Sequence, residues 1–224
     1  VMAALLAEAG HRVVGVDANA ATVDTVNAGR APVDEPGFVE LMRRLPDGVL
    51  TATGSYADAV AGTDLAMIVV PTPSRPTGGF DPSIVLDAVT EIGSALAASS
   101  RATPYGIVVV STLMPGTMSN EVVPALEKAS GMSIGDGVLL AYSPEFIALG
   151  TVITDMSSPD IVLIGAVDRR SLEITADLSA TFRAPSEIHA MTFTEAELAK
   201  LSINAYLSTK IGFANMIGAA DDRL

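Results

Sequence analysis

The stretch VMAALLAEAGHRVVGVD, residues 1–17, decides the fold that we expect for this chain. Its first nine residues are apolar and rich in alanine, which predicts a helix that ends at Gly10. The next apolar run, residues 12–16, predicts a buried strand that ends in Asp17. A helix followed by a strand with an acid at its carboxyl end is typical of a dinucleotide-binding unit. The strand and glycine-rich loop that open such a unit are not in the sequence, so we expect a chain that begins inside the motif.

Composition excludes several kinds of site and partner. The net charge of −13 argues against nucleic acid or an anionic membrane as a main partner. With no cysteine and two histidines, His11 and His189, the chain offers neither a thiol nucleophile nor a Cys- or His-rich metal site, so we expect no metal. No apolar run reaches the roughly 18 residues needed to span a bilayer, and we expect a cytoplasmic location.

Short apolar runs alternate with helical patterns along the chain, which predicts an α/β doubly wound parallel sheet, Rossmann-like but without its first strand and glycine loop. The expected strands are 12–16, 49–52, 64–70, 106–111, 137–142 and 160–165. The expected helices are 1–9, 20–28, 37–45, 55–61, 82–98, 117–129, 169–182 and 194–220. The segment 72–82, rich in Pro and Gly, is the clearest expected loop.

The last helical pattern is too long for a simple crossover between strands. We therefore expect two units, a dinucleotide-binding domain over residues 1–190, incomplete at its start, and the beginning of a central helical domain over 191–224. Two helix starts resemble capping boxes, with a hydroxyl followed three residues later by an acid: Ser55–Asp58 and Thr194–Glu197.

The missing first strand is central in this fold, between strands 12–16 and 64–70. An unpaired buried N–H or C=O costs roughly 1–3 kcal/mol, so a row of them would threaten the domain. We therefore expect that the gap does not stay empty. The strand could lie outside the chain as given, a strand of another chain could fill the gap, or the two flanking strands could pair directly.

Polar side chains stand where the expected strands end, and this edge is where open α/β sheets bind ligands. An acid such as Asp17 accepts hydrogen bonds from adenosine ribose hydroxyls, and the absence of Arg or Lys at positions 18 and 19 favours NAD over NADP. A helix N-cap is the alternative role for Asp17. Further along the chain, Thr72, Ser111 and Thr112 also follow strands, and the alternative for each is an ordinary turn or loop.

Two further features suggest catalysis. Glu145 follows a buried strand and is placed for acid–base work or for orienting a water molecule, the alternative being a solvated loop acid. Lys200 and Asn204 lie four residues apart, so they share one helix face and could together stabilise an oxyanion. Leucines such as Leu198 and Leu207 make this helix largely apolar, which favours a cleft for the polar pair over an exposed surface.

Six stretches of the chain, taken in order, resemble the UDP-glucose/GDP-mannose dehydrogenase family, the nucleotide-sugar 6-dehydrogenases. They are LLAEAGHRVVGVD, VNAGRAPVDEPG, VPTP, VVSTLMPGT, YSPEFIALG and AELAKLSINAYLSTKIGFAN. The family oxidises the C6 primary alcohol of a UDP- or GDP-sugar twice, to the carboxylate, with two NAD. The resemblance implies a fragment that ends inside the central helix, before the half that carries the catalytic Cys and Asp. It also implies a homodimer, formed through that helix in the full-length protein.

The resemblance implies roles for particular residues. The expected NAD contacts are Asp17, Thr72, Ser111 and Thr112. The expected catalytic set, in which the first two residues position or activate the hydrolytic water and the last two stabilise the oxyanion, is Thr112, Glu145, Lys200 and Asn204. The family's usual Asn before PEF is Ser143 here, and its usual REG is replaced by residues 148–150, ALG. These departures weaken an assignment to UDP-glucose and leave a UDP-hexosamine or another sugar open.

Two other interpretations of the function remain compatible with the sequence. The β-hydroxyacid and 6-phosphogluconate dehydrogenases also combine a dinucleotide domain, a long helix and a Lys-x-x-x-Asn pair. A non-catalytic remnant domain is the alternative of a different class, because the glycine loop and the Cys are both missing. For the isolated chain we expect weak NAD binding and no dehydrogenase activity, since the missing loop would hold the pyrophosphate.

Overall fold

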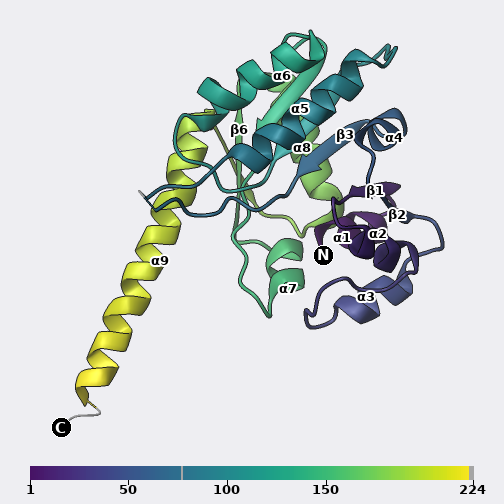
Figure 1. Cartoon of the computed structure of the whole chain (residues 1–224). Coiled ribbons are helices and arrows are strands. Elements are labelled where there is room, and N and C mark those ends of the chain that lie inside the picture. The colour runs from purple at the N-terminus through teal and green to yellow at the C-terminus, as the bar shows by residue number, and fades with distance from the viewer. Residues whose placement is uncertain (77, 222–224) are drawn as a thin grey trace.

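The computed structural model describes residues 1–76 and 78–221 as an α/β fold (Figure 1). Thr77, in the expected loop 72–82, and residues 222–224, in the expected second unit, lie outside the described residues. The strands are β1 (Val13–Val16), β2 (Leu50–Thr53), β3 (Leu65–Ile68), β4 (Tyr105–Val109), β5 (Val138–Tyr142), β6 (Ile161–Ala166) and β7 (Glu187–Met191). The helices are α1 (Met2–Glu8), α2 (Ala20–Asn27), α3 (Phe38–Arg44), α4 (Tyr56–Ala61), α5 (Ser83–Ala97), the π-helical η1 (Met118–Val122), α6 (Val123–Ser130), α7 (Val152–Ser157), α8 (Arg169–Phe182) and α9 (Phe193–Asp221).

Helices cover both faces of the larger sheet, which confirms the doubly wound architecture. The strand β4 shows this most clearly, because every residue of it is buried. Ile107 and Val109 pack with side chains of α5 and α6, whereas Val108 and Val110 pack with side chains of α1, α3 and α7. The nearly continuous apolar run of this strand therefore reflects burial on its two faces.

The strands form two separate sheets, one of β1 and β2 in parallel and one in the order β3-β4-β5-β6-β7. Within the described residues β1 pairs only with β2 and β3 only with β4, so direct pairing of 12–16 with 64–70 is wrong. Two helices link the smaller sheet to the rest of the fold. The helix α4 packs on both β1 and α5, and α1 packs on both β1 and α8. β1 is half-buried in the chain as given, and no described strand lies between it and β3. That a strand outside the chain as given, or a strand of another chain, fills this position stays a prediction.

The larger sheet is not wholly parallel, which corrects the sequence prediction. β6 runs antiparallel to β5 and overlaps it only where Ala141 and Tyr142 face Ala166 and Gly165. The chain between them makes a loop and the short α7, which packs on α1 instead of crossing the sheet. Without a crossover the next strand must return in the opposite direction.

The strand β7 and the helix α7 were not predicted from the sequence. β7 pairs with β6 in parallel at the sheet's edge, and its sequence EIHAM is half-exposed and partly charged. An edge strand of this kind lacks the apolar run that identifies a buried one. The helix α7 has only six residues, too few to show a helical repeat.

Of the two predicted capping boxes, the one at Ser55–Asp58 forms only its N-cap half, because the Ser55 N–H donates to Thr53 Oγ1 over 3.1 Å and not to Asp58. The Asp58 N–H donates to Ser55 Oγ over 3.2 Å at the start of α4. The box Thr194–Glu197 is wrong, because α9 begins at Phe193 and the Glu197 carboxylate accepts the N–H groups of Gly116 and Met118 instead. The box there is formed by Thr192 and Glu195, which exchange hydrogen bonds of 2.8 and 3.3 Å.

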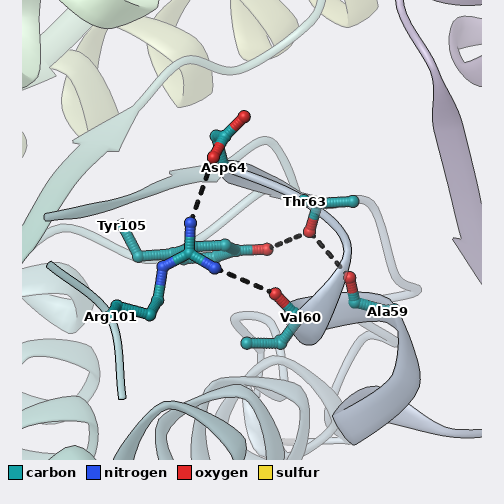
Figure 2. A network of polar contacts seen from close by, with 6 residues as sticks. All are labelled: Ala59, Val60, Thr63, Asp64, Arg101 and Tyr105. Atoms are coloured by element: carbon teal, nitrogen blue, oxygen red, sulfur yellow. Dashed lines mark hydrogen bonds and ion pairs between the residues drawn. The ribbon is translucent and has the colours of Figure 1, made fainter. Parts of the chain in front are cut away.

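A polar network closes the amino edge of β3 and β4 (Figure 2). The Arg101 guanidinium donates to Val60 O and Asp64, and the Tyr105 hydroxyl bonds to Thr63 Oγ1 over 2.8 Å. A hollow of about 460 Å³ beside Arg101 is lined by Ala61 and by residues 99–103. None of these residues belongs to the candidate site, which lies at the carboxyl edge, so we assign the hollow no role in it.

Candidate active site

The loops that follow β3, β4 and β5 meet at one edge of the sheet, because these three strands are parallel neighbours. The described residues of these loops are 69–76, 78–82, 110–117 and 143–151. The carboxyl end of β1, with Asp17, belongs to the smaller sheet. Among the described residues, no group of three or more His, Cys, Asp or Glu side chains is placed to hold a metal ion.

Asp17 is an exposed acid at the end of β1, and it is not the N-cap of the next helix. Its Oδ1 accepts the Asn19 N–H over 2.8 Å, and Asn19 caps α2 by accepting the Ala21 N–H over 3.0 Å. The N-cap alternative for Asp17 is therefore wrong. Within the described residues Oδ2 has no hydrogen-bond partner, and an exposed carboxylate oxygen of this kind can accept from a ribose hydroxyl.

Ser111 joins the loops after β3 and β4. Its hydroxyl donates to Val70 O over 2.8 Å and accepts the Val70 N–H over 2.9 Å. Thr72 lies two residues further along that loop and is half-buried. The buried Ser111 hydroxyl is thus engaged by the protein's own backbone, while contact of either side chain with NAD stays a prediction.

The loop that carries Thr112 is tied at three buried points. The Leu113 N–H donates to the Tyr142 hydroxyl over 3.3 Å, and burial raises the pKa of that hydroxyl. The N–H groups of Gly116 and Met118 donate to the two carboxylate oxygens of Glu197 over 2.6 and 2.7 Å. Thr112 itself is half-buried, and its hydroxyl has no hydrogen-bond partner among the described residues.

Glu197 is a buried acid beside the candidate site that the sequence analysis did not place there. It is completely buried, and burial raises the pKa of its carboxyl group while the two backbone N–H groups act against that rise. A signal for it was present, because Phe193, Ala196, Glu197 and Lys200 follow the i, i+3, i+4, i+7 spacing of one buried helix face. The leucines that guided the sequence analysis face outward, since Leu198 and Leu207 are 56% and 49% exposed.

Glu145 forms an ion pair with Arg183 in the interior of the site. The two side chains are only 9% and 6% exposed, so the alternative of a solvated loop acid is wrong. Burial raises the pKa of Glu145, and the charges of Arg183 and Lys200 act against that rise. Arg183 directly follows α8, and nothing in its local sequence indicated this partnership.

Lys200 connects the catalytic candidates. Its Nζ donates to the Glu145 carbonyl oxygen over 2.5 Å and to Asn204 Oδ1 over 3.3 Å, and lies 4.4 Å from the centroid of the Phe146 ring. Burial lowers the pKa of Lys200, and the Glu145 charge acts against this. The structure thus brings Glu145, Lys200 and Asn204 together, and Glu197 ties the Thr112 loop to the same helix one turn earlier.

Glu35 is a second buried acid that the sequence analysis did not assign. Its carboxylate accepts the N–H groups of Gly150 and Val152 over 3.1 and 2.9 Å. It thereby fixes the end of loop 143–151 and the start of α7, whose N-cap Thr151 makes no side-chain cap of its own. The segment VDEPG that contains Glu35 had been noted only as part of the resemblance.

Comparison with known proteins now assigns the family. The model of the UDP-glucose/GDP-mannose dehydrogenase family, NAD binding domain, matches residues 1–183. The chain belongs to this family. The match is to its NAD binding domain, which confirms NAD as the cofactor expected from the sequence.

Individual members of the family are similar over nearly the whole chain. A GDP-mannose 6-dehydrogenase of Pseudomonas syringae is 38% identical over 97% of this chain and 49% of its own length. A UDP-glucose 6-dehydrogenase of Haloferax volcanii is 38% identical over 96% of this chain and 50% of its own length. The crystal structure of a ternary complex of GDP-mannose dehydrogenase from Pseudomonas aeruginosa matches with a TM-score of 0.88 at 31% identity, over 96% of this chain and 48% of that one. The chain thus spans about half the length of these relatives.

Within the described residues, no helix combines the length and the apolar character that crossing a membrane would require.

Proposed function

We propose that this chain is the NAD-binding half of a nucleotide-sugar 6-dehydrogenase, which oxidises the C6 primary alcohol of a UDP- or GDP-sugar to a carboxylate. The observation that carries the proposal is the cluster of the buried Lys200 with the half-buried Glu145 and Asn204, beside loops at the carboxyl edge of the sheet. The family resemblance makes these three residues, together with Thr112, catalytic. The similar proteins include enzymes for both GDP-mannose and UDP-glucose, so the sugar is left open.

The cluster suits the stabilisation of negative charge on a reacting oxygen. Lys200 is held by a carbonyl and an amide oxygen, so its ammonium group is oriented before a substrate arrives. The Asn204 amide keeps its NH2 group for a second donor, since its oxygen accepts from Lys200. Glu145, kept close to Arg183, is the candidate for orienting or deprotonating a water molecule.

The residues present fit the adenosine side of NAD. Asp17 offers an exposed acceptor for ribose hydroxyls, and Ala18 and Asn19 beside it bring no cation for a 2′-phosphate. Thr72 and Thr112 are the further candidates for contacts, with Ser111 shaping the loops between them. When bound, NAD accepts the hydride that leaves the alcohol carbon. Residues 1–224 contain no G-x-G-x-x-G sequence, so we expect weak NAD binding by the chain alone.

The unit boundary and the dimer are parts of the same proposal. We assign residues 1–190 to the NAD-binding domain and 191–224 to the start of a central helical domain. The outer part of α9 supports this, because large apolar side chains stand exposed along it: Tyr206, Leu207, Ile211, Phe213, Met216 and Ile217. A second copy packing along this helix would bury them.

The test is an assay of the full-length protein with a panel of UDP- and GDP-sugars and NAD, following NADH. We expect two NADH per sugar for at least one substrate, and loss of turnover in Lys200→Met with little change in NAD affinity. If no sugar on the panel yields NADH, the proposal is wrong. Absence of both turnover and saturable NAD binding would instead favour the non-catalytic remnant.

A further inference from the structure

The buried acid Glu197 lies outside every role assigned so far. It is completely buried, comes from α9, and accepts one N–H with each carboxylate oxygen, from Gly116 and Met118. Gly116 belongs to the end of the loop that carries Thr112, and Met118 is the first residue of η1, which follows this loop directly. A side chain that lies so deep cannot reach a substrate, so any effect on a reaction must pass through this loop.

The position of Glu197 explains why the loop needs a partner from elsewhere. Gly116 and Met118 flank Thr117, the N-cap of η1, which makes no side-chain cap. The first N–H groups of a helix have no partner within it and carry partial positive charge. Glu197 supplies the missing acceptor from a helix about 80 residues away along the chain. Because both oxygens are used, the carboxylate fixes two points of the loop at once.

The same part of α9 also holds the neighbouring loop. Lys200, one turn after Glu197, donates to the Glu145 carbonyl oxygen. Tyr142, at the end of β5, accepts the N–H of Leu113 in the Thr112 loop. The start of α9 therefore acts as a common anchor for the loops that carry Thr112 and Glu145.

We propose that Glu197 is a positioning residue of this site, which sets the placement of Thr112 relative to Lys200 through Gly116 and Met118. The inference rests on the proposed dehydrogenase function and deepens it by adding a residue that no substrate touches. Displacing a reacting group by about 1 Å can cost roughly 100-fold in rate, so a change in this anchor should appear in kcat.

The test uses Glu197→Gln in the full-length protein. Glutamine keeps one acceptor oxygen but presents an NH2 group to the second N–H, so only one of the two ties survives. We expect kcat to fall roughly 10- to 100-fold while KM for NAD changes by less than about 3-fold. Glu195→Gln is the matched control, because it makes the same substitution on the same helix and a capping box accepts glutamine. It should leave kcat unchanged.

A double substitution separates positioning from a general structural role. If Glu197 acts through Thr112, then Glu197→Gln should lower kcat by less than about 3-fold once Thr112→Ala is present, because coupled residues are not additive. Hydrogen exchange should show faster exchange at Gly116 and Met118 in Glu197→Gln. Should that variant fail to fold, Glu197→Asp, a shorter carboxylate, replaces it with the same expected pattern.

The possible outcomes are distinct. Unchanged kcat in Glu197→Gln, or a loss that is fully additive with Thr112→Ala, would overturn the positioning role while leaving the proposed function intact. Absence of turnover in the unsubstituted protein would overturn the proposed function, and the role of Glu197 with it. A coupled loss of kcat with faster exchange at the two amides supports the inference.

Discussion

Glu35 offers the sharpest test of how the site is held together. In Glu35→Ala, the N–H groups of Gly150 and Val152 lose their acceptor at a position where the carboxylate is only 7% exposed. Each hydrogen bond to a charged group contributes roughly 1.5–3 kcal/mol, and water can recover part of this at the half-open loop end. We therefore expect the free energy of unfolding to fall by about 2–5 kcal/mol. A central value of about 3 kcal/mol lowers the melting temperature of a chain this long by roughly 6–12 °C.

The assay is equilibrium unfolding of the 224-residue chain in urea, with hydrogen exchange at the amides of Gly150 and Val152. Glu35→Gln keeps one acceptor oxygen and should lose about half as much stability. The control Glu40→Ala removes an exposed acid of α3 and should change stability by no more than about 0.5 kcal/mol. If Glu35→Ala matched Glu40→Ala, the long-range carboxylate would not be holding the loop, and the reasoning would be refuted.

Two other predictions follow from the contacts. In Arg183→Met the pKa of Glu145, already raised by burial, should rise further because the opposing cation is gone; carboxyl NMR would detect this. A carboxyl whose folded pKa is raised binds more protons in the native state, so stability falls as pH rises from the ordinary value through the folded one, and this fall should be larger in Arg183→Met. An equal pH dependence in both proteins would count against the pair. In Asn27→Ala, two hydrogen bonds to the Ala52 backbone at the edge of β2 are lost, and urea unfolding should show a destabilisation of about 1–2 kcal/mol.

The parts of the fold that follow a hydrophobic period could be predicted from the sequence. β4 and β5 are continuous apolar runs because they are covered on both faces, and the helices that cover them repeat at 3.6 residues. The direction of β6 could not be predicted, because it depends on whether residues 143–160 cross the sheet or stay at its edge. Periodicity carries no information on that choice.

The candidate site shows the same division. Lys200 and Asn204 could be paired from their spacing alone, since an i, i+4 pair must share a helix face. The partners of Arg183, Glu35 and Glu197 could not be predicted from spacing, because each of these side chains forms hydrogen bonds with groups dozens of residues away along the chain. The polar groups that these residues bind come within hydrogen-bond distance only when folding brings separate loops to one edge of the sheet.

The exposed half of α9 has a consequence for local stability. Beyond Ala205 its described side chains face solvent, so in the isolated 224-residue chain these turns gain no free energy from packing on its other described residues. An isolated helix as short as the part beyond Ala205 is marginal in water, and Gly212 within it costs about 1 kcal/mol relative to alanine. The stability of the helix against local unfolding should therefore decrease along α9. Amide protection should be highest near Lys200 and should fall turn by turn towards Ile217. A surface that packs on Tyr206 and Phe213 would shift the local unfolding equilibrium towards helix by the apolar area that it covers.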